Sequence, residues 1–210
     1  MRRQLILWRH GRTAWNASGR VQGQSDVPLD EVGVAQASAA AARLATLAPS
    51  RIVSSDLMRA RATAQLLADL TGLKVEDDTR LREMNFGVRE GLTMAEALER
   101  HPEEMAAWLA NSDVRMPGGE TYAEAAARFA EGVRDLLVGL ADDQTAVVVA
   151  HGAVLRVGIC EFLGIPQAYW RTFGGFNNCS WSVLEEAHQG WRVAEWNAGS
   201  LPEPVLSDDT

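Results

Sequence analysis

Two histidines in this chain each follow an apolar run and precede a glycine. His10 stands in LILWRHG, and His151 stands in TAVVVAHG. Each apolar run is too short for a helix and is typical of a buried strand. A histidine at the end of such a strand either completes the core or does chemistry, for which its largely neutral imidazole is suited near pH 7. His10 and His151 are therefore candidates for one shared site.

Arginine supplies almost all of the positive charge in this sequence. Of the 20 basic residues only Lys74 is a lysine. A planar guanidinium binds oxyanions through two N–H groups at once. Arg9 directly precedes His10, and two more arginines, Arg59 and Arg61, lie in SSDLMRARATA. This excess is compatible with an oxyanion site, and an arginine-rich genome composition would produce it as well.

Length, charge and cysteine content limit the class of protein. A chain of 210 residues with 47% hydrophobic content can bury one full core. The net charge of −8 argues against a protein that coats nucleic acid or an anionic membrane. The start MRRQLILWRHG is not expected to act as a secretory signal, because its apolar stretch before Arg9 is short, and no apolar run is long enough to span a membrane. Cys160 and Cys179 lack metal-ligand spacing, which favours neither a zinc site nor a disulfide framework and indicates a cytoplasmic location.

Strand and helix patterns alternate along the chain. Strands are expected at QLILW, RIVSS, LKVED and TAVVVA, with a hairpin in CSWSVLEEAHQGWRVAEWN around Gln189-Gly190. Helices are expected at about 31–47, in DLMRARATAQLLADLTG, at about 121–140, and in AVLRVGICEFLGI. The second of these helices is expected to bury Leu57, Ala60, Ala64, Leu67 and Leu70 on one side.

This alternation predicts an α/β fold. We expect a single domain with a mostly parallel central sheet, an antiparallel edge and helices on both faces. Ligands of such sheets bind at the carboxyl ends of the strands, where His10 and His151 both fall. The domain is expected to cover 1–197, with 81–119 as an insertion over the active site and 198–210 as a flexible tail.

Four segments together resemble one known family. RHGRTAWN, SSDLMRARATA, LREMNFGVREG and VVAHGAVLR are similar, in order, interval and context, to motifs of the histidine phosphatase superfamily, also called phosphoglycerate mutase-like. The resemblance covers about residues 4 to 197. It implies the phosphoglycerate mutase-like fold and a phosphoryl-transfer reaction.

The resemblance also implies a catalytic set. It assigns His10 as the nucleophile that becomes a phosphohistidine, and Arg9 and Arg59 as the arginines that bind phosphate. His151 would stabilise charge in the transition state, and Glu83 would protonate the leaving oxygen. Arg61, two residues beyond Arg59, is expected at the surface. Arginines and His151 supply the charge stabilisation, so neither a metal nor a cofactor is expected.

Four further residues near the first motif are candidates for the same site. Asn16, Gln22 and Gly23 match positions that bind phosphate in some members of the family, and loop capping is an alternative for Asn16 and Gln22. Arg12 stands where many relatives have glutamate. It is expected either to bind a more anionic substrate or to pair with the acidic middle segment.

The same catalytic set is compatible with three functions. FGVREG resembles the phosphatase branch, whereas Ala153 stands where the mutase branch has asparagine, so a phosphatase is favoured over a cofactor-dependent phosphoglycerate mutase. A non-catalytic binding module is disfavoured because the catalytic set is complete. The partner implied is a small phosphorylated metabolite, with glucosyl-3-phosphoglycerate or a related sugar-acid phosphate as the candidate substrate. Broad phosphomonoesterase activity and α-ribazole phosphate are the alternatives.

The oligomeric state is expected from relatives to be a homodimer. The aromatic hairpin region carries three tryptophans: Trp181, Trp191 and Trp196. These side chains would belong either to the core or to a dimer surface.

Overall fold

A six-stranded mixed sheet forms the centre of the protein in the computed structural model, which describes residues 3–110 and 113–199. The strands are β1 (Gln4–Arg9), β2 (Arg51–Ser54), β3 (Val75–Asp77), β4 (Thr145–Ala150), β5 (Trp181–Ala187) and β6 (Gly190–Ala198). They lie in the order β3-β2-β4-β1-β5-β6. The first four in this order run parallel, and β5 and β6 add an antiparallel edge, which confirms the predicted α/β fold.

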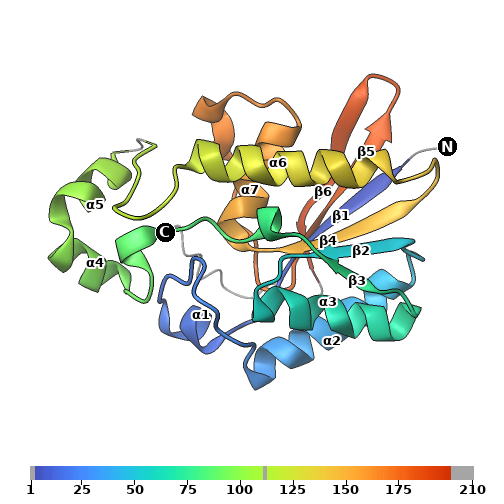
Figure 1. Ribbon diagram of the computed structural model, residues 1–210, viewed down its shortest axis with the longest axis horizontal. Coiled ribbons are helices and arrows are strands. Elements are labelled where there is room, and N and C mark those ends of the chain that lie inside the picture. The colour runs from blue at the N-terminus through green and yellow to red at the C-terminus, as the bar shows by residue number, and fades with distance from the viewer. Residues whose placement is uncertain (1–2, 111–112, 200–210) are drawn as a thin grey trace.

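Helices cover both faces of the sheet (Figure 1). The longer ones are α2 (Glu31–Ala45), α3 (Met58–Thr71), α6 (Tyr122–Val138) and α7 (Gly152–Phe162). The shorter ones are α1 (Ala14–Ser18), α4 (Met94–Arg100), α5 (Pro102–Leu109) and the 3₁₀ helices η1 (Thr79–Leu81), η2 (Gly87–Arg89) and η3 (Gln167–Thr172). None of the helices in the described part of the chain is long and apolar enough to cross a membrane.

Strand β1 divides the apolar core into two layers. Its alternate side chains point to opposite faces of the sheet. Ile6 and Trp8 pack with α2 and α3, whereas Leu5 and Leu7 pack with α6 and α7. All four side chains are buried, so β1 is anchored on both faces and the position of His10 directly after it is fixed.

Helix α3 corrects one prediction from the apolar pattern. Leu57, Ala60, Ala64 and Leu67 are buried as expected, but 58% of the Leu70 side chain is exposed. Ala68 is buried instead. Thr63, two turns earlier on the same side as Leu70, is fully buried, so this side of α3 is covered near its start and open in its last turn. Helix α2 also differs, ending at Ala45 rather than near residue 47.

The middle segment lies at one end of the sheet and carries α4 and α5 (Figure 1). Backbone hydrogen bonds tie it to the loop after α1: Val21 N–H donates to the Leu92 carbonyl, and Gly91 N–H donates to the Val21 carbonyl. The ion pair between Arg20 and Glu96 adds a further link. The segment is thereby attached to the loop that follows His10. Most of the tail predicted at 198–210, from residue 200 on, lies outside the described residues.

The hairpin tryptophans belong mainly to the core. Trp181 is buried, and Trp191 and Trp196 are partly buried against the layer that contains α7. Trp191 contacts the ring of Phe162, and Trp196 contacts the ring of Phe176. These contacts explain the aromatic content of β5 and β6 without a partner chain.

Candidate active site

His10 lies at the carboxyl end of β1, the central strand of the sheet. Its side chain is 2% exposed, and its backbone N–H donates to the Ala150 carbonyl at the end of neighbouring β4. The His10 Nδ1 atom is 2.7 Å from the Gly11 carbonyl oxygen. Because a carbonyl oxygen can only accept, Nδ1 carries the proton and Nε2 keeps its lone pair. The imidazole is therefore held in the tautomer that can act as a nucleophile at Nε2.

His151 occupies the equivalent place at the end of β4. Its ring centroid is 5.1 Å from that of His10. Arg59 Nε donates a hydrogen bond to His151 Nδ1 at 3.2 Å, and Ser55 Oγ is 2.8 Å from His151 Nε2. An arginine can only donate, so the proton of neutral His151 is on Nε2. The parallel pairing of β1 with β4 thus brings together two histidines 141 positions apart in the sequence.

The surroundings keep both imidazoles neutral. Burial lowers the pKa of His10 well below its ordinary value of 6.5, and the positive charges of Arg59 and Arg9 lower it further. Burial likewise lowers the pKa of His151, with contributions from Arg59, His10 and Arg9. A neutral histidine is the form that can attack phosphorus, so the site is prepared for nucleophilic chemistry across the neutral pH range.

Arg59 and Arg9 are the arginines that the fold brings to this pair. Arg59 is fully buried on α3, and Nη2 donates to the carbonyl of Gly23 at 2.7 Å. Arg9 is 2% exposed, and Nη1 donates to the carbonyl of Phe176. Arg61 points elsewhere, since it forms an ion pair with Asp77 beside β3. Arg59 rather than Arg61 therefore faces the histidines.

The glycines of the two His-Gly pairs make room for neighbouring groups. A Cβ on Gly11 would lie 2.4 Å from the Gly33 carbonyl oxygen in α2. A Cβ on Gly152 would lie 3.2 Å from the Arg9 guanidinium carbon. The first glycine lets α2 approach the loop after His10, and the second lets Arg9 lie against the start of α7.

Asn16 and Gln22 combine a structural contact with an unused donor. The Asn16 Oδ1 atom accepts from Thr13 N–H at 3.1 Å, which completes a capping box at the start of α1. Gln22 Oε1 accepts from Thr13 Oγ1 at 2.9 Å. The Asn16 Nδ2 and Gln22 Nε2 atoms are buried with no hydrogen-bond partner among the described residues. Each side chain thus caps a loop through its oxygen and keeps an N–H₂ group for an anion.

Glu83 is attached to the same helix that follows His151. Its side chain is 3% exposed, and its carboxylate accepts from Ala153 N–H at 3.1 Å and Val154 N–H at 2.8 Å. A third N–H group, that of Met84, donates to Oε1 at 2.8 Å. Glu83 thus occupies the positive N-terminal end of α7, where the His151 side chain makes no capping bond. The N-terminus of α7 therefore positions both Glu83 and His151.

Arg12 forms an ion pair outside the middle segment 81–119. Its Nε atom lies 2.9 Å from Asp30 Oδ2. The prediction of an ion pair with the acidic middle segment is wrong, because Asp30 precedes α2 and lies outside 81–119. Asp30 also accepts from Gly33 N–H as the N-cap of α2. This contact gives Arg12 a structural role at the start of α2.

Two residues near the site were not singled out in the sequence. Ser55 contacts His151, and Arg128 of α6 contacts the segment that contains Glu83. Arg128 donates to the carbonyls of Arg80, Arg82 and Glu83 and pairs with the carboxylate of Glu120. Arg128 lies outside the four segments that resemble the family. The only sequence signal for it is its position among the apolar residues of the helix expected at about 121–140.

The arrangement as a whole can bind and transfer a phosphoryl group. Arg9 and Arg59 lie close enough to His10 and His151 to lower their pKa values, and Asn16 and Gln22 keep buried amide donors in the segment that follows His10. Such donors stabilise the equatorial oxygens of a transferring phosphoryl group. Within residues 3–110 and 113–199, no three His, Cys, Asp or Glu side chains cluster closely enough to hold a metal ion.

A family model and several relatives match this chain. The model of the histidine phosphatase superfamily (branch 1) matches residues 5–199. The glucosyl-3-phosphoglycerate phosphatase of Mycobacterium tuberculosis is 39% identical over 214 residues, a region that covers 94% of this chain and 96% of the relative. A protein of Erwinia tasmaniensis named "Probable phosphoglycerate mutase GpmB" is 35% identical over 209 residues, covering 99% of this chain and 96% of the relative.

Several solved structures are also similar to this chain. The complex of mycobacterial glucosyl-3-phosphoglycerate phosphatase with VO3 matches with a TM-score of 0.87 and 40% identity. The match covers 94% of this chain and 100% of that structure. Bacillus stearothermophilus YhfR matches with a TM-score of 0.84 and 27% identity, over 94% of this chain and 98% of that structure.

Proposed function

The chain belongs to the histidine phosphatase superfamily (branch 1), and from this premise we propose that it is a phosphomonoesterase with His10 as its nucleophile. The observation that carries the proposal is the pair of buried neutral histidines, His10 and His151, with ring centroids 5.1 Å apart and Arg59 bonded to the second. Neutral His10 supplies the lone pair, and Arg9, Arg59 and His151 supply positive or donor groups around the phosphate.

The proposed reaction has two steps, formation of the phosphohistidine and its hydrolysis. His10 Nε2 attacks phosphorus, the bond from phosphorus to the ester oxygen breaks, and that oxygen takes a proton from Glu83. Water then attacks the phosphohistidine, its proton passes to the Glu83 carboxylate, and phosphate leaves with His10 restored. Asn16, Gln22 and Gly23 line the phosphate side: the amide groups donate to the phosphate oxygens, and the Gly23 carbonyl orients Arg59.

Glu83 must be protonated to act in the first step. Its three backbone donors stabilise the charged carboxylate before substrate binds. A phosphate dianion close to this carboxylate opposes that charge, so substrate binding itself favours uptake of the proton. The acid is then generated where the leaving oxygen needs it.

The substrate that we propose is glucosyl-3-phosphoglycerate or a related sugar-acid phosphate. This proposal is supported by 39% identity to a relative named for that activity and by 37% identity to a second one from Mycolicibacterium vanbaalenii. The test is a panel of phosphate esters assayed for release of inorganic phosphate, with p-nitrophenyl phosphate as the general substrate. Preferred hydrolysis of the sugar-acid phosphate supports the proposal, broad activity without preference contradicts the substrate, and no phosphate release from any ester contradicts the enzyme.

A mutase is the second candidate because of the 35% identical relative with a mutase name. Incubation of 3-phosphoglycerate with catalytic 2,3-bisphosphoglycerate distinguishes the two. We expect phosphate and glycerate as products. Efficient formation of 2-phosphoglycerate would instead show that the phosphohistidine returns its phosphate to a second hydroxyl.

We also propose a cytoplasmic homodimer. Cys160 and Cys179 are both buried, which suits a compartment without disulfide formation. Strand β6 contains nine residues and is an edge strand of the sheet. The unpaired backbone groups of an edge strand can form hydrogen bonds with a second copy of the chain. Light scattering coupled to size-exclusion chromatography measures the mass directly, and a monomer at micromolar concentration would contradict the dimer.

A further inference from the structure

Glu90 lies directly after η2 in the segment FGVREG, and its carboxylate accepts hydrogen bonds at both oxygens. Oε1 accepts from Gln24 N–H at 3.0 Å and from Phe86 N–H at 3.2 Å. Oε2 accepts from Ser25 N–H at 3.1 Å and from Ser25 Oγ at 2.9 Å. Three of these donors belong to the loop between α1 and α2, so Glu90 joins the middle segment to that loop.

Arg59 binds the same loop through two carbonyl groups. Its side chain is fully buried, and Nη2 donates to the Gly23 carbonyl at 2.7 Å and Nη1 to the Ser25 carbonyl at 2.8 Å. Its Nε atom donates to His151 Nδ1 at 3.2 Å. The N–H groups of a planar guanidinium have fixed relative directions, so the two loop carbonyls set the direction of Nε toward His151.

A single peptide group lies between the Glu90 carboxylate and the Arg59 guanidinium. The Gly23 carbonyl and the Gln24 N–H belong to this group, and in a trans peptide they point in opposite directions. The N–H donates to Glu90 and the carbonyl accepts from Arg59, so each hydrogen bond has one ionised partner. Such bonds are stronger than neutral ones, and bonds that share a peptide group polarise one another. The negative charge of Glu90 thus stabilises the peptide orientation on which the Arg59 contact depends.

Gly23 allows the Glu90 carboxylate to come this close to the loop. Its φ is +52°, in the left-handed region, and a Cβ at this position would lie 2.0 Å from Glu90 Oε1. Any side chain here would therefore displace the carboxylate from Gln24 N–H. The contact between Glu90 and the loop depends on the glycine.

The loop requires a carboxylate at position 90 and not an amide. Each Glu90 oxygen accepts at least one hydrogen bond from a backbone N–H group. A glutamine in either side-chain orientation would place its NH₂ group against one of these donors. Glu90→Gln therefore removes the charge and breaks part of the contact with little change in size.

We propose that Glu90 is a positioning residue for Arg59, holding its guanidinium toward His151 through the Gly23–Gln24 peptide group. The inference rests on the proposed phosphatase activity, in which Arg59 binds phosphate, and deepens it. If this peptide group turned away, Arg59 would lose one of the two loop carbonyls that orient it, and phosphate binding would weaken.

Orthovanadate, an analogue of phosphate, tests this proposal by isothermal titration calorimetry, which needs no turnover. The first variant is Glu90→Gln. The milder variant is Glu90→Asp, which keeps the charge but is one methylene too short to make the same contacts. The matched control is Glu96→Gln, because Glu96 also attaches the middle segment to the region after α1, through its ion pair with Arg20. Circular dichroism and urea unfolding verify that each variant is folded.

We expect Glu90→Gln to raise the Kd for vanadate about tenfold or more, as expected for loss of a charge-assisted hydrogen bond. Glu90→Asp should raise it to a smaller extent. The kcat/KM for p-nitrophenyl phosphate should fall in parallel, whereas Glu96→Gln should keep the wild-type values of both quantities. The NMR signal of the Arg59 Nε–H, identified by its loss in Arg59→Gln, should shift in Glu90→Gln and stay in place in Glu96→Gln.

A double-mutant cycle shows whether Glu90 acts through Arg59. Arg59→Gln alone should weaken vanadate binding, because it removes a phosphate-binding group. Adding Glu90→Gln to this variant should weaken binding further by no more than about twofold, since the group that Glu90 positions is already gone.

Three results would overturn the inference while leaving the phosphatase activity in place. One is an unchanged Kd for vanadate in both Glu90 variants. Another is an equal loss in Glu96→Gln, which would mean that both glutamates only attach the middle segment. The third is a full additional loss from Glu90→Gln in the Arg59→Gln background, which would mean that Glu90 acts on another group. Absence of both vanadate binding and phosphate release from p-nitrophenyl phosphate in the wild type would instead refute the proposed function.

Discussion

Arg128 Nη2 donates a hydrogen bond to the backbone carbonyl of Glu83 at 2.8 Å. The same guanidinium binds the carbonyls of Arg80 and Arg82, and Glu120 holds it in place. The backbone of Glu83 is thus fixed by α6, whereas its carboxylate is fixed by the start of α7. Arg128 is a positioning residue for the proposed acid, because its contact is with the main chain that carries the carboxylate.

Replacement of Arg128 should therefore impair proton transfer more than substrate binding. We expect Arg128→Gln to lower kcat by about 10- to 100-fold, with a small change in KM, since general acid catalysis contributes about 100-fold or more. The loss should be larger for alkyl phosphates than for p-nitrophenyl phosphate, whose leaving group needs little protonation. Arg128→Lys should recover part of the activity.

The control for this prediction is Arg115→Gln. Arg115 is an exposed arginine that pairs with Glu124 near the start of α6, and its replacement should leave both substrates unaffected. Equal losses in Arg128→Gln for good and poor leaving groups would show that Arg128 supports the fold in general and not the acid.

His10 should be indispensable for turnover but not for folding. We expect His10→Ala to reduce phosphate release by at least about 10³-fold, because loss of a nucleophile removes the covalent step. The circular dichroism spectrum should be retained. His188→Ala, at an exposed position in the turn between β5 and β6, is the control. Appreciable activity in His10→Ala would refute the assignment of the nucleophile.

Stability should decrease as the pH falls below 6.5. The pKa values of buried His10 and His151 lie well below 6.5 in the folded chain, whereas in the unfolded chain these groups bind protons near pH 6.5. The unfolded state then gains more protons as the pH drops, at up to about 1.4 kcal/mol per pH unit for each histidine. Their contribution is constant above pH 6.5 and is lost progressively below it.

Urea unfolding between pH 8 and pH 5 measures this effect. Carboxylates with a lowered pKa, such as Asp56 beside Arg82, begin to lose their contribution only near their ordinary pKa of 3.8. Glutamates with a lowered pKa, such as Glu96 beside Arg20, begin to do so near their ordinary pKa of 4.5, so the histidines dominate the change between pH 6.5 and pH 5.5. The slope should be shallower in His10→Gln than in the wild type, and an identical slope in both proteins would contradict a buried neutral His10.

Gln22→Glu should weaken phosphate binding. The substitution keeps Oε1, which accepts from Thr13, and replaces the buried Nε2 donor with a negatively charged oxygen. We expect the inhibition constant for inorganic phosphate to rise about tenfold or more, through loss of a charge-assisted hydrogen bond and added repulsion. Gln189→Glu, in the exposed turn before β6, should leave it unchanged. Unchanged phosphate inhibition in Gln22→Glu would restrict Gln22 to loop capping.

Arg12→Ala should affect stability slightly and catalysis little. The ion pair with Asp30 is partly exposed, so its loss should lower the free energy of unfolding by about 1 kcal/mol or less. Asp30→Asn tests the same pair from the other side. A rise in KM confined to carboxylate-bearing esters in Arg12→Ala would show that Arg12 leaves Asp30 to bind substrate.

The sequence by itself determined the strands, the main helices and the two histidines at strand ends. These features depend on local apolar periodicity, on turn residues and on short motifs, all of which are contained within a few neighbouring residues. The parallel order of the sheet then follows from alternation of strand and helix, and it brings His10 and His151 to one edge. Leu70 shows the limit of such patterns, because it shares one side of α3 with the buried Thr63 and only the packing around the last turn of the helix leaves it exposed.

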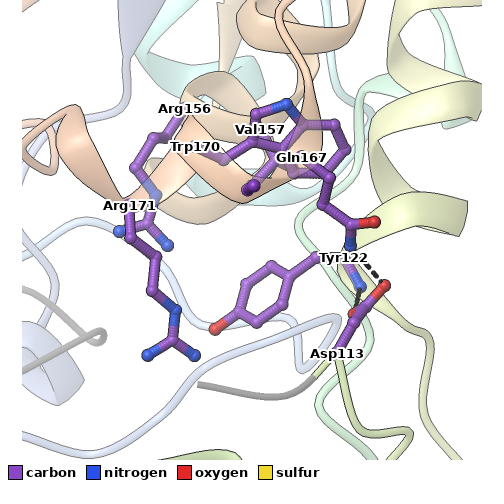
Figure 2. A pocket seen from close by; sticks show the side chains of 8 residues that line it. Asp113, Tyr122, Arg156, Val157, Gln167, Trp170 and Arg171 are labelled. Atoms are coloured by element: carbon purple, nitrogen blue, oxygen red, sulfur yellow. Dashed lines mark hydrogen bonds between the residues drawn. The ribbon is translucent and has the colours of Figure 1, made fainter.

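Only the tertiary structure decided which groups each charged side chain contacts. Arg12 pairs with Asp30, Glu83 caps α7 and Arg128 binds the main chain of Glu83, across 18, 70 or 71, and 45 positions of sequence. Long side chains can reach several partners, and the packing of helices on the sheet selects among them. A pocket lined by Tyr122, Arg156 and Arg171 has the same origin, since side chains from α6, α7 and η3 together form its walls (Figure 2).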